Sequence, residues 1–111
     1  MRLAAGLLLL STTAAAAQTH PCAKDAVAKA RPLLELHHGT KLEELGTVDD
    51  KVKVLPPIKA LKGNGKLDVL EVWGYIYKAE YRMRFIYIQG TKPGESCALM
   101  GQEILENSNP Y

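Results

Sequence analysis

The pattern of apolar positions changes once along the chain and predicts two kinds of element. Over residues 20–38, apolar side chains recur every three or four positions, which is typical of a helix with one buried face. From Lys51 onward the period falls to two, which predicts strands. We therefore expect an α+β domain in which one helix is followed by a run of strands.

The predicted helix has a buried stripe rich in small residues and a clear stop signal. Cys22, Ala26 and Leu33 flank this stripe. Gly39 follows the last turn and is free to adopt the positive φ of a helix cap. Pro32 lies inside the predicted helix and predicts a kink about one turn before its own position. The stripe itself consists of Ala23, Val27, Ala30, Leu34 and His37.

Four strands are expected, and they should form an antiparallel β-meander with the N-terminal helix packed on one face. Pro56 and Pro57 fall in the first of them, which is tolerated only at a sheet edge or a bulge. Residues 40–50 predict one helical turn or a loop. The strands are predicted over residues 51–60, 67–77, 81–89 and 97–105.

The N-terminus has the residue order of a secretory signal peptide. Arg2 precedes an apolar run at 3–10 and a stretch of small residues. The run is about eight residues long, whereas a transmembrane helix needs about 20. We predict a cleaved signal peptide over 1–17, a single domain over 18–106 and a frayed tail over 107–111, in a periplasmic or secreted protein. An uncleaved N-terminal anchor is the alternative.

The two cysteines, Cys22 and Cys97, are expected to pair. An even number of cysteines in an exported chain favours a disulfide. A bond closing a loop of about 75 residues stabilises a domain by roughly 4 kcal/mol in the chain-entropy model. It would join the start of the helix to the last strand. Two unpaired buried thiols are the alternative, and without a Cys-x-x-Cys spacing a redox role is not indicated.

Charge and motif content exclude several classes of protein. The formal net charge is only +2, so a protein built to hold nucleic acid is not expected. No Ser–His–Asp or Cys–His set can be assembled, so we expect a non-enzymatic protein without a cofactor. Lysines on the first predicted hairpin favour edge protection over the attraction of an anionic partner. They are Lys51, Lys53, Lys59, Lys62 and Lys66.

The second predicted strand carries aromatic side chains on one face. Arginine and aromatic residues are enriched at protein interfaces because they bury much area and keep a polar end. The register of the next strand decides whether this face continues with Arg82 and Arg84 or with the neighbouring Tyr81, Met83, Phe85 and Tyr87. A second core layer under residues 40–50 is the alternative to binding another protein or a second copy. The predicted binding surface consists of Glu71, Trp73, Tyr75, Tyr77, Arg82 and Arg84.

The mature N-terminus offers a second, different function. Cleavage after residue 17 would leave Gln18, Thr19 and His20 in front, with histidine third. An amine, two backbone amides and an imidazole make a square-planar nitrogen site that suits Cu(II) or Ni(II). A metal- or small-ligand-binding protein of the cell envelope is therefore the alternative hypothesis. His37 and His38 diverge by about 100° on a helix, so they do not form a site together.

Overall fold

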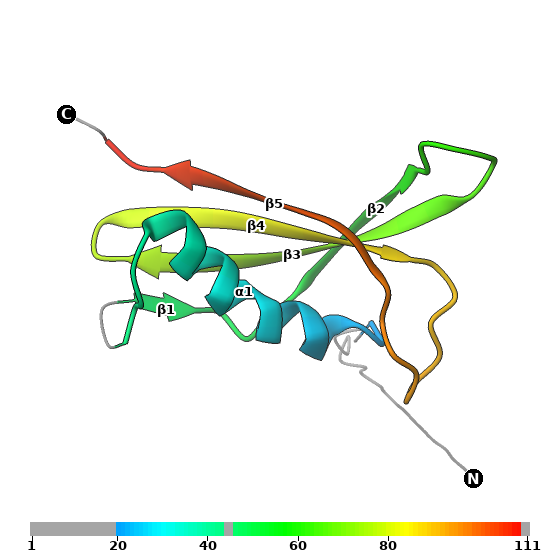
Figure 1. Ribbon diagram of the computed structural model, residues 1–111, viewed down its shortest axis with the longest axis horizontal. Helices are drawn as coiled ribbons and strands as arrows, with labels where there is room; N and C mark the ends of the chain where they lie inside the picture. Colours follow the sequence, from blue (N-terminus) through cyan, green and yellow to red (C-terminus); the bar gives the residue numbers. More distant parts are fainter. Residues whose placement is uncertain (1–19, 44–45, 110–111) are drawn as a thin grey trace, which may run out of the picture.

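One helix, α1 (Ala23–His38), lies against one face of an antiparallel sheet in the computed structural model (Figure 1). The structure describes residues 20–43 and 46–109. The predicted signal peptide, Gln18 and Thr19 fall outside these residues. Within the described part, no helix is long and apolar enough to cross a bilayer. The predicted α+β class and its helix-on-sheet packing are confirmed.

The sheet has five strands, of which four follow the predicted meander order. Each strand from β2 to β5 pairs with the next one along the chain, and β1 lies beside β2 on the same edge of β3. Residues 40–50 were expected to form a helical turn or a loop, and the fifth strand within them was not predicted because three residues are too few to show a period of two. The strands are β1 (Gly46–Val48), β2 (Lys53–Lys59), β3 (Lys66–Ile76), β4 (Ala79–Ile88) and β5 (Leu99–Asn107).

The edge position of β2 explains how its two prolines fit. The pairing of β2 with β3 shifts between Leu55 and Ile58, and this bulge holds Pro56 and Pro57. Because a proline has no N–H to donate, it is accommodated at an edge or a bulge, and β2 provides both. The prediction for this strand is confirmed.

The buried stripe of α1 is rotated slightly from the predicted one. Val27 is only half-buried and His37 is exposed, whereas the predicted flanking residues lie at the centre. The cap prediction holds: Gly39 adopts φ 94° and its N–H donates to the carbonyl of Glu35 at 2.8 Å. The buried residues at the helix start and along the helix are Cys22, Ala26, Ala30, Leu33 and Leu34.

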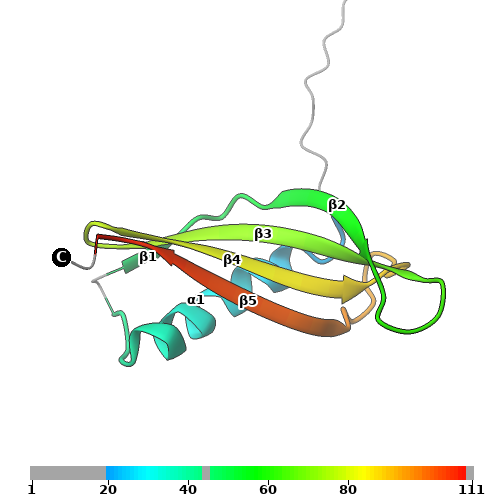
Figure 2. The ribbon, with the colours of Figure 1, turned by 90° about the horizontal axis from the view of Figure 1, so that it is seen from above.

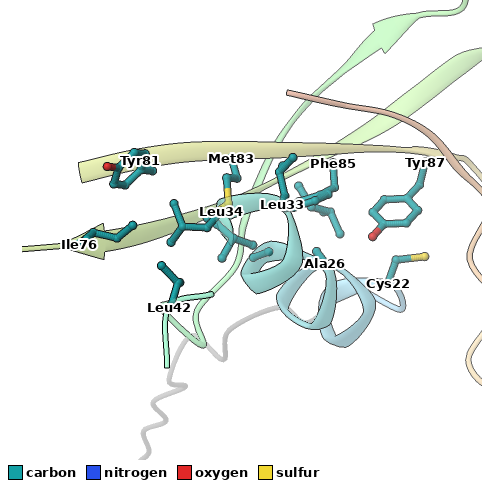
Figure 3. Packing of buried hydrophobic residues seen from close by; sticks show 13 residues of the cluster. Cys22, Ala26, Leu33, Leu34, Leu42, Ile76, Tyr81, Met83, Phe85 and Tyr87 are labelled. Atoms are coloured by element: carbon teal, nitrogen blue, oxygen red, sulfur yellow. The ribbon is translucent and has the colours of Figure 1, made fainter. Parts of the chain in front are cut away.

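The core forms between α1 and alternate residues of the central strands (Figure 3). The helix lies close to β3 at Gly74, where a Cβ would lie 2.9 Å from Leu34 Cδ2 and 3.0 Å from Met83 Cε. Only glycine fits there without displacing the core. The β4 side chains that point at the helix are Tyr81, Met83, Phe85 and Tyr87, all of them buried.

A disulfide and two hydrogen bonds tie the helix to the sheet. Cys22 and Cys97 are bonded, with their Cα atoms 5.8 Å apart, as predicted. Cys97 lies two residues before β5 rather than within it. The Tyr87 hydroxyl donates to Asp25 at 2.7 Å, and burial together with this carboxylate raises the pKa of Tyr87. At the other end of the helix, the His37 ring bonds Glu106 at 2.8 Å.

Candidate functional site

The sheet face turned away from α1, called here the outer face, is not covered by any other described element (Figures 1 and 2). Directly paired residues of antiparallel strands point to the same face. The register therefore places Lys53, Glu71, Arg84 and Glu103 in one line across β2, β3, β4 and β5. This line, the charged row, alternates in sign from one edge of the sheet to the other.

Two rows of aliphatic side chains lie between the charged row and the β2–β3 hairpin. One row crosses Leu55, Val69 and Ile86 and ends at Gly101, and the next crosses Ile58, Leu67 and Ile88. Val69 is buried among its neighbours, but Ile58 and Ile88 keep 42% and 45% of their surface exposed. We call the six apolar side chains the aliphatic patch: Leu55, Ile58, Leu67, Val69, Ile86 and Ile88.

On the other side of the charged row lies the aromatic part of the predicted surface. Trp73, Arg82 and Leu105 form one row, and Leu105 is 55% exposed. Tyr75 stands opposite Glu80 in the next row and donates its hydroxyl to Asp49 at 3.3 Å. Burial, followed by the charge and hydrogen bond of Asp49, raises the pKa of Tyr75.

Five of the six predicted surface residues share the outer face. The observed register pairs Trp73 with Arg82, so the arginines and not the tyrosines of β4 join the aromatic side chains. Tyr77 does not belong to this face. Strand β3 ends at Ile76, and Tyr77 lies in the turn with φ 53° and 88% of its surface exposed. The prediction carried the strand one residue too far, because no glycine marks the positive φ of this turn.

Glu71 is the buried charged residue of the outer face and organises its centre. It is 5% exposed, accepts from Arg84 Nε at 2.9 Å and accepts from Trp73 Nε1 at 3.1 Å. Burial by itself raises the pKa of Glu71, but the hydrogen bonds from Arg84 and Trp73 and the charges of Arg84 and Lys53 give a net lowering. The carboxylate is therefore ionised at neutral pH, and it fixes the orientation of the indole and one guanidinium.

Arg82 is held more loosely than Arg84. Its nearest carboxylate contacts are 3.9 Å to Glu71 and 4.0 Å to Glu103. Among the described residues, its buried Nε lacks a hydrogen-bond acceptor. Buried donors are usually satisfied, so this guanidinium gains a hydrogen bond if it reorients toward an added acceptor.

The structure places His20 in a network that competes with metal binding. The Cys22 N–H donates to Nδ1 at 2.9 Å, which leaves Nε2 to donate its proton to Asp68 at 2.7 Å. Hydrogen bonds from His20 and Gln89 outweigh burial and lower the pKa of Asp68. A metal ion would have to displace one of the two imidazole bonds. Among the described residues no group of three or more histidine, cysteine or acidic side chains is placed to hold a metal.

The aliphatic patch was not predicted from the sequence. The signal was present, because Leu67 and Val69 share the alternation of Trp73, and Ile86 and Ile88 share that of Arg84. The predicted surface was chosen for arginine and aromatic residues, which lie at one end of the outer face, whereas the aliphatic residues lie at the other end.

Comparison of the chain with models of known protein families, with curated proteins and with solved structures gave no match.

Proposed function

We propose that the chain is an exported, non-enzymatic binding module that recognises a protein through its outer face. The observation that carries this proposal is the aliphatic patch. An antiparallel sheet normally presents a polar face to water when only one side is covered. Here three strands instead carry neighbouring apolar side chains on the uncovered side, with Ile58 and Ile88 each more than 40% exposed.

The remainder of the face supplies the polar contacts that a protein interface needs. A hydrophobic centre with aromatic and arginine neighbours and a polar rim is the usual composition of such interfaces. Trp73 and Arg84 are pre-oriented by Glu71, so little side-chain entropy is lost when a partner binds. Arg82 offers a guanidinium whose hydrogen bonds are incomplete.

The proposed compartment is the periplasm or the extracellular medium. The Cys22–Cys97 disulfide supports an oxidising compartment. The residue order of the N-terminus, which lies outside the described residues, supports export by a signal peptide.

Site-specific photo-cross-linking in living cells tests this function. A photoreactive amino acid replaces Ile88 on the outer face in one variant. In the matched control it replaces Leu36, which is 76% exposed on α1. We expect a discrete protein adduct, identified by mass spectrometry, from position 88 and not from position 36. Equal cross-linking from both positions, or no adduct from position 88 in a folded variant, would contradict the proposal.

A further inference from the structure

We infer that the occupant of the outer face is a second copy of the same chain, packed face to face about a two-fold axis that runs parallel to the strands between β3 and β4. The inference rests on the proposed function and names its partner. It starts from the sign order of the charged row, which reads plus, minus, plus, minus from Lys53 to Glu103. When the row is read in the reverse direction, every sign is replaced by its opposite, so the row of one copy is complementary to the reversed row of a second copy.

The two-fold axis decides which residues of two stacked copies oppose one another. An axis along the strands keeps each row level with its counterpart and reverses the order across the sheet. Lys53 then faces Glu103 of the second copy, and Glu71 faces Arg84. An axis along the rows would instead place each charge over its own copy, and like charges in opposition disfavour association. Of these two face-to-face arrangements, charge therefore favours the axis along the strands.

The size of the apolar side chains fits the same axis. The aliphatic row next to the charged row begins with Leu55 on β2 and ends with Gly101 on β5. Reversal brings the large side chain of one copy over the glycine of the other and Val69 over Ile86. On the opposite side of the charged row, Trp73 faces Arg82 of the second copy, where an indole and a guanidinium can stack. Each of these contacts occurs twice, as in any isologous interface.

The area is adequate for a dimer of ordinary size. Four strands about 4.8 Å apart and five rows about 6.8 Å apart give a face of roughly 600 Å² in projection. A corrugated surface of this extent approaches the ~800 Å² that each partner contributes to a standard interface. Two stacked sheets are rotated by about 30° relative to each other, so opposing residues of the two copies line up best near the middle of the face. The charged row is the middle row of the five.

Lys53 and Glu103 allow a test that separates contacts between chains from contacts within one chain. They lie on β2 and β5, three strands apart, or about 14 Å, so they do not pair within a single chain. Lys53 is exposed and the Glu103 side chain is 54% exposed, so neither substitution buries a new charge. Each position also has an opposite charge beside it in its own chain, Glu71 for Lys53 and Arg82 for Glu103, so the stability of every variant is measured as well. The test compares Lys53→Glu, Glu103→Lys and the double variant by sedimentation velocity of the disulfide-bonded protein over a range of concentrations.

Each single substitution replaces two attractive contacts in the dimer with two repulsive ones. We expect each to weaken dimerisation by roughly tenfold to a hundredfold, and the double variant to return to within about threefold of the unsubstituted protein. Lys24→Glu, an exposed substitution on α1 that changes the charge equally, should leave dimerisation unchanged. Thermal unfolding of every variant at a concentration where all are monomeric shows whether the fold is intact.

Three results would overturn the inference. A protein that stays monomeric at every concentration excludes the second copy as occupant. In that case the proposed function would still be supported if position 88 cross-links to a different protein in cells. A dimer that the single substitutions do not weaken, or that the double substitution does not restore, excludes this axis.

Discussion

Replacing Glu71 with glutamine tests the electrostatic centre of the outer face. The substitution keeps the shape of the side chain and removes its charge. The geometry at stake is the 2.9 Å hydrogen bond from Arg84 and the 3.1 Å bond from Trp73, at a site that is 5% exposed. A glutamine oxygen can accept only one of these donors well, because its NH₂ group then faces the other.

The expected loss of stability follows from burial of the acceptor and partial exposure of the donor. A hydrogen bond to a charged group contributes about 1.5–3 kcal/mol, and breaking a fully buried ion pair costs about 3–5 kcal/mol. The Arg84 side chain is 30% exposed, so water compensates part of its lost partner and the lower range applies. We expect Glu71→Gln to lower the free energy of unfolding by about 2 kcal/mol, which for a domain of this size lowers Tm by roughly 10 °C.

The pH dependence of this difference gives a second check. The folded-state pKa of Glu71 is lowered, so its stabilising contribution is complete above the unfolded-state pKa and is lost as the pH falls through the folded-state pKa. The difference between the original protein and Glu71→Gln should therefore be full at pH 7 and shrink in acid. Urea unfolding followed by circular dichroism at pH 7 and in acid measures it.

The matched control is Glu103→Gln in the same row. Its side chain is 54% exposed and its nearest cation is 4.0 Å away, so we expect a change below about 0.5 kcal/mol. Equal effects of the two substitutions would contradict the role assigned to the burial of Glu71. So would a Glu71→Gln effect that does not change with pH.

Four further substitutions, each measured by urea unfolding, test the packing of the two faces and the bonds that tie the helix to the sheet. Gly74→Ala should cost about 1–3 kcal/mol because the new Cβ would meet the helix and Met83 at 3.0 Å or less. Gly101→Ala, whose Cβ would lie 3.6 Å from Ile86, should leave the monomer as stable or stabilise it by up to about 1 kcal/mol; a loss matching that of Gly74→Ala would contradict this placement. Tyr87→Phe should cost about 1–2 kcal/mol through loss of the 2.7 Å bond to Asp25, and no loss would show that this bond does not tie the helix to the sheet. Cys97→Ser should cost about 2–4 kcal/mol, and an unchanged stability would show that the disulfide does not restrain the fold.

Long elements were predictable from the sequence because their periods are sustained. The strands that became β3 and β4 alternate over ten residues or more, and their ends were placed within two residues. The three residues of β1 carry no such pattern, and they form a strand because Gly46 lets the chain lie close to the end of β3. Their structure depends on tertiary pairing, which a local pattern does not encode.

The composition of the outer face depended on the number of residues in one turn. The pattern alone left two possible partners for Trp73, because a shift of one residue turns a whole strand over. The turn between β3 and β4 places Ile76 opposite Ala79, and this pairing brings Arg82 and Arg84 beside the aromatic side chains. Tyr77 adopts a positive φ within that turn. A tyrosine gives no signal for that conformation, so neither the turn nor the register could be derived from local residue types.

The most direct measurement of the central claim uses Trp73, the single tryptophan of the chain, which lies on the outer face. Acrylamide quenching of its fluorescence should be measured across the concentration range in which the protein dimerises. If a second copy covers the outer face, quenching falls as the concentration rises, and Lys53→Glu moves the change to higher concentration. If quenching is the same in monomer and dimer, the outer face is open in both and the account of its occupant is wrong.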